Sequence, residues 1–216
     1  GSASDVNSAY ASGGVTNLDG DEAVTLSDTT LAAATLNTLD GNTTGAVDAT
    51  TVTTLTGSAA NVNTAYESMG ISNLADEAVT LTDTSLAAAT LNMLDGNTTG
   101  TINAATLRTL TGSAANANTA YASGGVTNLG DVTVILTDTT LTVATLNTLI
   151  GYSTGLVDAT TVTTLTGSTT DVNTAFTAFA EGKINSLGNE AVTLTDTAVF
   201  AETVVAIDSA TSGAIN

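Results

Sequence analysis

The chain repeats itself with a period of 55 residues, and this periodicity constrains its fold more than any other feature. The string LTGS recurs and places Gly57, Gly112 and Gly167 at equivalent positions. The first copy is one residue longer, and the fourth is cut short and holds additional residues. Such self-similarity is typical of solenoids. The sequence therefore predicts a single solenoid over residues 1–216, made of the repeats 1–56, 57–111, 112–166 and 167–216.

The second copy indicates which segments of one repeat form secondary structure. Ser58 is a suitable N-cap for a helix and Gly70 a suitable stop. Between them, residues at helical spacing define one apolar face: Ala59, Val62, Ala65 and Tyr66. The segment Glu77–Thr82 alternates apolar and polar residues, which predicts a half-buried strand, and Thr101–Asn103 predicts a second, short strand.

Asp and Asn recur at two positions that we expect to be helix N-caps, because their side-chain oxygens accept hydrogen bonds from a helix start. One set precedes a long helix with Leu86, Leu91 and Leu94 in its apolar face: Asp28, Asp83, Asp138 and Asp196. The other precedes a short helix with Leu107 and Leu110: Asp48, Asn103, Asp158 and Asn216. Many of the acidic residues thereby have a structural role that needs no ligand.

Each repeat contains two similar halves, for example Asp28–Val47 and Asp48–Ile71. Both halves hold a capping residue, an apolar helix face and a glycine, so each is predicted to be one coil of strand plus helix. The expected fold is an α/β solenoid with about two coils per repeat, short parallel strands on one wall and short helices on the other. With only three Phe and four Tyr, its core must be thin and built from Leu, Val, Ile and Ala.

The chain is strongly acidic. Its 21 acidic residues face only 2 basic ones, Arg108 and Lys183, and the net charge is −19. Such a surface repels nucleic acids and anionic membranes, so both are excluded as partners. No apolar stretch suits membrane insertion, and no signal peptide is visible. A start at Gly1 predicts a fragment or a processed product, in which Gly1-Ser2 is either a cloning scar or the GS that opens the other repeats.

Three strings, LTGSAANVNTAY, EAVTLTDTSLAAATLN and LDGNTTG, resemble the tandem repeats of very large secreted or cell-surface proteins of marine cyanobacteria, some of them hemolysin-like or adhesin-like. The resemblance covers the whole chain. It implies an extracellular or cell-surface setting and a parent protein far longer than this piece. It says little about activity, because such repeats mostly build length.

Few residues are candidates for catalysis. The chain has no His and no Cys, which excludes Ser–His–Asp and Cys–His arrangements, and a Ser–Lys pair could use only Lys183. Glycoside hydrolysis needs two carboxylates, which stand at Asp21-Glu22 and Asp76-Glu77. The third copy has Asp131-Val132 instead, so the pairing is not kept. We expect no enzyme activity and no catalytic residues.

Calcium binding is a more serious alternative. The segments Asp40–Asp48 and Asp95–Asn103 carry oxygen-bearing side chains at positions one, three and five and glycine at six, as the first part of an EF-hand loop does. Position twelve is threonine in both, where a bidentate acid should stand. The third copy replaces the first two ligands by Ile150 and Tyr152. The third copy keeps Gly155, Val157 and Asp158, which a helix stop, a strand and a cap require without any ligand. We therefore expect no metal and no cofactor.

Ice binding is a third alternative, since Thr recurs at outward strand positions. One set is Thr25, Thr80, Ile135 and Thr193, and another is Ser27, Thr82, Thr137 and Thr195. Ile135 interrupts the first set, and Thr suits exposed strand faces without any ligand. A recurring aromatic position suggests sugar stacking or core anchoring: Tyr10, Tyr66, Tyr121 and Phe176. We favour core anchoring, because Phe176 shows that the hydroxyl is dispensable.

The sequence therefore predicts a structural spacer or stalk module of a large bacterial surface or secreted protein. The alternative is a calcium-dependent adhesion or ligand-binding module. The expected partners are neighbouring repeats of the parent protein. Open layers at both ends of the chain also predict end-to-end self-association.

Overall fold

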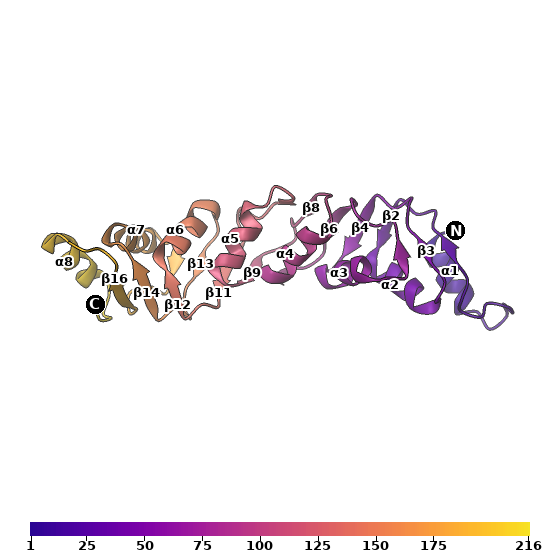
Figure 1. The fold of residues 1–216 in the computed structure, drawn as a ribbon, viewed down its shortest axis with the longest axis horizontal. Coiled ribbons are helices and arrows are strands. Elements are labelled where there is room, and N and C mark those ends of the chain that lie inside the picture. Colours follow the sequence, from indigo (N-terminus) through magenta and orange to yellow (C-terminus); the bar gives the residue numbers. More distant parts are fainter. The chain divides into compact units, whose positions relative to one another are not determined.

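A computed structural model describes all 216 residues as a repeated alternation of short strands and helices (Figure 1). The contacts divide the chain into two compact units. The first unit contains Gly1–Asp83, Thr90–Thr106 and Gly124–Asn128, and the second contains Thr84–Ala89, Leu107–Ser123 and Leu129–Asn216. No helix has the length and the apolar character that crossing a membrane requires.

The helices are short and lie side by side within each unit. Their bounds are α1 Ala3–Tyr10, α2 Ala33–Asn42, α3 Ala59–Glu67, α4 Ala88–Asn97, α5 Ala114–Ala122, α6 Val143–Tyr152, α7 Thr169–Ala180 and α8 Ala201–Ala210. In the first unit α2 packs between α1 and α3. In the second unit α5, α6, α7 and α8 pack in sequence order (Figure 1).

The strands pair only in parallel. Those of the first unit are β1 Val24–Thr25, β2 Thr30–Ala32, β3 Val47–Asp48, β4 Thr54–Gly57, β5 Ile71–Ser72, β6 Ala78–Leu81, β8 Ile102–Asn103 and β10 Val126–Thr127. They form sheets of order β1-β3-β5 and β10-β8-β6-β4-β2. Those of the second unit are β7 Ser85–Ala87, β9 Thr109–Gly112, β11 Thr133–Leu136, β12 Thr140–Thr142, β13 Val157–Asp158, β14 Thr164–Gly167, β15 Ile184–Asn185 and β16 Ala191–Leu194. They form sheets of order β15-β13-β11-β9-β7 and β12-β14-β16.

Neighbouring strands of a sheet come from successive passes of the chain, where a pass is the stretch of about 24 residues between paired positions. Leu31 pairs with Leu55, and Leu55 pairs with Val79. Leu55 and Val79 are buried, as is Leu91 on α4. The core consists mainly of Leu, Val, Ile and Ala, as the composition predicts, and it also includes Phe176. The predicted α/β class, the parallel pairing and the repeating pattern are confirmed.

The predicted helix in the second copy is confirmed as α3, and its N-cap is Ser58. The Ser58 hydroxyl accepts a hydrogen bond from the N–H of Asn61 at 3.3 Å. Ser2, Ser113 and Ser168 cap α1, α5 and α7 in the same way. Helix α3 buries Ala59, Val62 and Ala65, and it ends at Glu67 rather than at Gly70. The predicted strands at Glu77–Thr82 and Thr101–Asn103 are confirmed as β6 and β8.

The aspartates expected to cap the long helices cap the other helices instead, so this prediction is wrong. Asp83 accepts a hydrogen bond at 2.8 Å from the N–H of Ala59, the first residue of α3, one pass earlier. The same contact recurs in every copy, for the pairs Asp28–Ala3, Asp138–Ala114 and Asp196–Thr169. The physical reason is that strand β7 separates Asp83 from the start of α4 at Ala88. Leu86, expected in the apolar face of the long helix, lies on β7 instead.

The prediction of a short helix around Leu107 and Leu110 is also wrong. Asn103 forms a tight turn by accepting the N–H of Ala105 at 3.1 Å, and the chain continues as strand β9. Asp48 and Asp158 make the same turn before β4 and β14. Threonine alternates with leucine in β9, and this β-branched pattern favours a strand. Leu110 is fully buried, and it lies on a strand and not on a helix.

Asp83→Ala should lower the free energy of unfolding by about 1 kcal/mol, because the first N–H of α3 loses its acceptor. Chemical denaturation followed by circular dichroism measures this loss. Asp76→Ala is the matched control, since Asp76 is exposed and the change of charge is the same. The control should shift stability by no more than about 0.5 kcal/mol. Equal losses would attribute the effect to charge and not to the cap.

Candidate functional site

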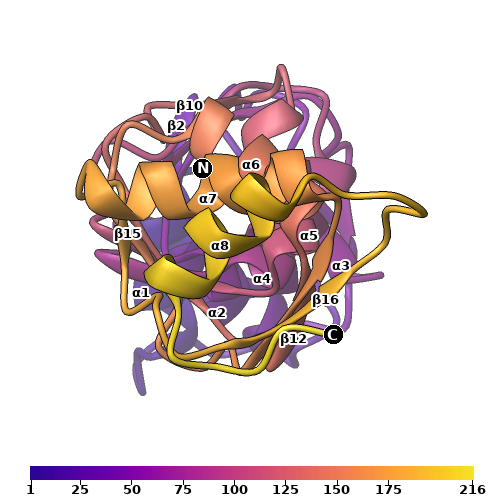
Figure 2. The same ribbon diagram turned by 90° about the vertical axis from the view of Figure 1, so that its left-hand side faces the viewer.

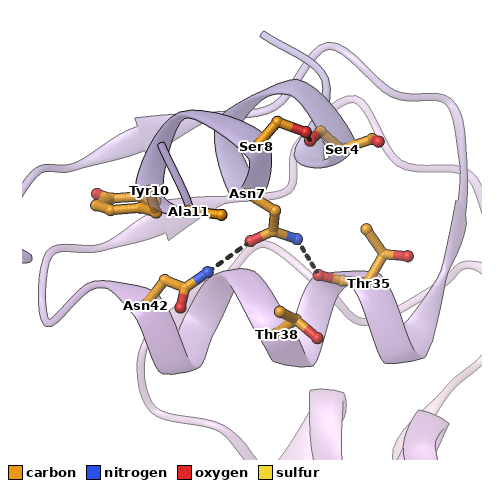
Figure 3. A pocket seen from close by; sticks show the side chains of 8 residues that line it. All are labelled: Ser4, Asn7, Ser8, Tyr10, Ala11, Thr35, Thr38 and Asn42. Atoms are coloured by element: carbon orange, nitrogen blue, oxygen red, sulfur yellow. Dashed lines mark hydrogen bonds between the residues drawn. The ribbon is translucent and has the colours of Figure 1, made fainter. Parts of the chain in front are cut away.

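A groove of about 460 Å³ lies between α1 and α2 in the first unit (Figure 3). Small polar side chains and one tyrosine line it: Ser4, Asn7, Ser8, Tyr10, Ala11, Thr35, Thr38 and Asn42. Asn7 donates from Nδ2 to the carbonyl of Thr35, and its Oδ1 accepts from Nδ2 of Asn42, both at 3.0 Å. This lining can hydrogen-bond a neutral polar molecule. It holds no carboxylate, amine or imidazole.

The groove is not a feature of every repeat. In the second copy Glu67 stands at the position of Ala11, and Met93 at the position of Thr38. Both side chains are larger than those they replace. A site that served the repeat as a whole would keep its lining, so this groove gives no evidence for a binding function of the module.

Asparagines inside five of the helices each form a hydrogen bond with the next helix. In each of these contacts, Nδ2 donates to a backbone carbonyl of the next helix at 2.9–3.3 Å: Asn7 to Thr35, Asn37 to Asn61, Asn63 to Thr90, Asn118 to Thr145 and Asn147 to Asp171. Asn is a poor helix former. Its recurrence at fixed helix positions is therefore the sequence signal for this role, which the cap and core patterns did not reveal.

A tyrosine and a glutamate form a pair in each of the first two copies. The hydroxyl of Tyr66 donates to Oε2 of Glu77 at 3.0 Å, and the N–H of Ala75 donates to the same oxygen. Tyr10 and Glu22 make the same contact at 3.0 Å. Burial raises the pKa of Tyr66, so its phenol remains a donor at neutral pH. Glu77 is only 1% exposed, which makes this pair part of the core.

The third and fourth copies each lack one member of the pair. In the third, Val132 replaces the glutamate, and Tyr121 donates to the carbonyl of Leu129 at 3.0 Å instead. In the fourth, Phe176 replaces the tyrosine. Glu190 then accepts backbone N–H groups only through Oε2, and its buried Oε1 has no partner. Because either member can be replaced, the pair serves packing and not chemistry.

The carboxylate pairs considered for catalysis do not face a common cleft. Glu77 is buried against Tyr66, whereas its neighbour Asp76 is exposed. The backbone N–H of Asp19 donates to Glu22 and lowers the pKa of that carboxyl. The ammonium of Lys183 forms an exposed ion pair with Glu181 at 2.9 Å. None of these groups lines the groove between α1 and α2, although Glu22 accepts a hydrogen bond from Tyr10, which does.

The oxygen-bearing residues of the EF-hand-like segment turn toward different partners. Asp40 lies within α2 and accepts a hydrogen bond from Ser68 at 2.7 Å. Asn42 donates to Asn7, and Thr44 donates to the carbonyl of Gly20 at 3.0 Å. No group of three or more acidic side chains is arranged to hold a metal ion. In this structure the side chains of the segment bond separate partners and do not converge on one point.

The glycine at the sixth position of that segment has a steric cause. A Cβ atom at Gly45 would lie 2.4 Å from the backbone of Glu22, which passes beside it. The equivalent glycines meet the same obstacle: Gly100, Gly155 and Gly213. This close approach accounts for a glycine in all four copies without any ligand.

The predicted threonine sets are not ladders. Thr25, Thr80, Ile135 and Thr193 lie on strands of four different sheets. The direct neighbours of Thr80 on its sheet are Thr56 and Asn103. The prediction failed because it assumed that equivalent strands share one sheet, whereas each repeat starts a new one. The outward rows mix Thr with Asn, Asp and Ala, so they do not form the regular threonine surface that ice binding was expected to need.

Asp48 holds the turn between β3 and β4. It accepts hydrogen bonds from the hydroxyl and the N–H of Thr50 and from Nδ2 of Asn73. The Thr50 hydroxyl, followed by Asn73, lowers the pKa of Asp48. Asn103 occupies the same position in the second copy and accepts from Asn128 at 2.8 Å. The turn thus needs an acceptor oxygen and not a negative charge.

No protein family, curated protein or solved structure matches the chain.

Phe176→Tyr should raise the free energy of unfolding by about 1 kcal/mol, because the new hydroxyl can donate to the unpartnered Oε1 of Glu190. Chemical denaturation of both proteins provides the measurement. Phe179→Tyr is the matched control, since it adds the same hydroxyl to a half-buried position of α7. A loss of stability in Phe176→Tyr, or an equal gain in the control, would contradict this account of the pair.

Asp48→Asn should change how stability depends on acid. The folded-state pKa of Asp48 is lowered, so its ionised form contributes stability above its unfolded pKa of about 4. That contribution is lost as the pH falls through the folded pKa. The melting temperature of the variant should therefore fall less steeply than that of the parent below about pH 4. Asn103→Asp is the reciprocal variant and should gain acid sensitivity; parallel curves for all three proteins would refute the assignment.

Proposed function

We propose that the chain is a structural spacer, an α/β solenoid module of a large bacterial surface or secreted protein, without catalytic activity. The observation on which the proposal rests is that the same contact between an aspartate and a helix start recurs in all four copies, for example between Asp83 and Ala59 at a separation of 24 residues. Each such contact links one pass only to the next. Stability that comes from nearest neighbours lets length grow with copy number.

The use of the acidic residues supports a spacer over a binding module. Asp28, Asp83 and Asp138 cap helices one pass earlier. Asp40 accepts from Ser68, and Asp48 holds a turn. These carboxylates already have partners within the chain. The remaining charge keeps the surface hydrated and repels polyanions.

The surface or secreted setting rests on the resemblance of the repeats to those of giant cyanobacterial surface proteins. In that setting the partners are neighbouring repeats of the parent protein. The physical task of the module would be to hold flanking domains apart at a fixed distance.

The length of the molecule should change in equal steps when one repeat, residues 57–111, is deleted or duplicated. Both junctions keep the sequence phase, because Gly57 and Gly112 are equivalent. Small-angle scattering measures the maximum dimension of the three proteins. Equal increments are expected for a solenoid. A maximum dimension that barely changes while the radius of the cross-section grows would contradict the proposal.

Melting curves in excess chelator and in millimolar calcium separate the spacer from the calcium-dependent alternative. Superimposable curves are expected for a spacer. A rise in melting temperature with calcium would mean that the native state binds the ion, and the alternative function of calcium-dependent adhesion would then be preferred.

A further inference from the structure

Two asparagines of the first unit, Asn42 and Asn97, stand in the tripeptide that accepts N-linked sugars. Residues 42–44 and 97–99 both read NTT, at the same position of the first and second copies, and an aspartate precedes each acceptor by two residues. Asn, any residue except Pro, and then Ser or Thr is the acceptor pattern of N-linked glycosylation, which lies on surface segments of secreted proteins. Because Asn and Thr are both frequent in this chain, the tripeptide gains its meaning from where the fold places it.

The end of α2 presents the asparagine and the second threonine on the same side of the chain. Asn42 is the last residue of α2, and Thr43 after it is extended, with φ −134° and ψ 145°. Side chains on either side of an extended residue point the same way. Asn42 and Thr44 are accordingly exposed, whereas Thr43 is buried and donates to the carbonyl of Glu22 at 2.7 Å. An enzyme can therefore reach the amide and the hydroxyl from one side.

The surface beside Asn42 is open. A Cβ atom at Gly41 would meet nothing within 4 Å, and Asn42 lines the groove between α1 and α2 (Figure 3). Nδ2 of Asn42 donates to Oδ1 of Asn7 at 3.0 Å. An amide nitrogen carries two hydrogens, so this bond uses one and leaves the other for substitution. The Thr44 hydroxyl donates to the carbonyl of Gly20 at 3.0 Å, in an exposed contact that an enzyme can replace.

The second acceptor, Asn97, has less room. Its neighbour Gly96 is open in the same way, and Thr99 is exposed. Asn97 itself is half-buried, whereas the equivalent residue of the first copy is exposed. The larger side chains of Glu67 and Met93 stand at positions that line the groove in the first copy. The first copy should therefore be modified more readily than the second.

The second unit keeps the turn but lacks the asparagine. Ser153 and Thr211 are extended, as Thr43 is. Tyr152 and Ala210 stand at the position of the asparagine. The turn thus belongs to the fold of every copy, whereas an acceptor at this position is confined to the first unit.

We propose that Asn42 and Asn97 accept N-linked oligosaccharides, with Asn42 the preferred acceptor. The donor is an oligosaccharide on a polyprenyl diphosphate. Nδ2 forms a bond to the anomeric carbon and loses one proton, while the bond from that carbon to the diphosphate oxygen breaks and the lipid diphosphate leaves. The secondary amide of Asn42 keeps one N–H, which can still donate to Asn7. The inference rests on the surface or secreted setting of the proposed function.

Transfer to the folded full chain tests the assignment. The chain is incubated with a single-subunit oligosaccharyltransferase and a polyprenyl-diphosphate-linked oligosaccharide, and intact-mass spectrometry shows how many glycans each molecule carries. The parent should gain two glycans, the first of them at Asn42. Asn42→Gln and Asn97→Gln should each lose one glycan, and the double variant should lose both. Thr44→Val keeps Asn42 but removes the hydroxyl, and it should also lose one glycan; circular dichroism verifies that each variant is folded.

Two further variants separate the geometry of the turn from the tripeptide alone. Ala9→Thr gives Asn7 the acceptor pattern, with Asp5 two residues before it, but inside α1. Side chains two residues apart on a helix do not face the same way, so Asn7 should gain no glycan. Ile150→Asp with Tyr152→Asn gives the turn of the third copy an acceptor and should add one glycan.

A folded parent chain that gains no mass, or a glycan that persists in the double variant, would overturn the proposal. Equal transfer to Asn7 in the Ala9→Thr protein and to Asn42 would overturn the role of the turn. The scattering series decides the spacer proposal independently. Absent transfer with equal increments of length would remove the acceptor assignment alone, and transfer with unequal increments would remove the spacer alone.

Discussion

The hydrogen bond from the first N–H of a helix to an aspartate one pass later fixes how the passes of this chain lie beside one another. For Ala59 and Asp83 the two groups are 24 residues apart, which is also the interval between paired residues of β4 and β6. A shift of one residue in the sheet would carry the aspartate away from the helix start. The asparagine contacts between helices span a similar interval of 24 to 28 residues. Backbone and side-chain hydrogen bonds therefore enforce the same register, and the thin aliphatic core needs no large side chains to define it.

The four copies show which contacts the fold requires. The aspartate cap and the glycine at the close approach of two passes are present in every copy. The pair of Tyr66 and Glu77 is not, because the third copy has Val132 and the fourth has Phe176. When Val132 takes the place of the carboxylate, the hydroxyl of Tyr121 finds carbonyl acceptors nearby. When Phe176 takes the place of the phenol, an oxygen of Glu190 is left unpaired in the core. Replacing the glutamate by Val132 therefore leaves no polar atom of the pair unbonded, whereas replacing the tyrosine by Phe176 leaves one.

Local patterns in the sequence were sufficient for the repeat, the serine N-caps and the strands with strict alternation. Local patterns failed for Asp83. Strand β7 lies between Asp83 and the next helix, α4, so Asp83 is not close to the start of α4 and caps α3 instead. They failed for Leu110, because a spacing of three between leucines fits a helix as well as an irregular turn followed by a strand. Pairing with β7 and β11 decides between the two. The groove beside Asn7 was beyond prediction, since it depends on how closely two helices approach and on small residues at Ala11 and Thr38.

The acidity of the chain follows from how its hydrogen bonds are made. The carboxylates that hold the fold accept from backbone N–H groups, hydroxyls and amides, as Asp83, Asp40 and Asp48 do. None of these contacts requires a cation, and the ion pair of Lys183 with Glu181 is exposed. The number of acidic residues can therefore increase with the number of repeats without a matching number of basic residues. Every added copy then makes the net charge more negative. Such accumulated negative charge repels other polyanions.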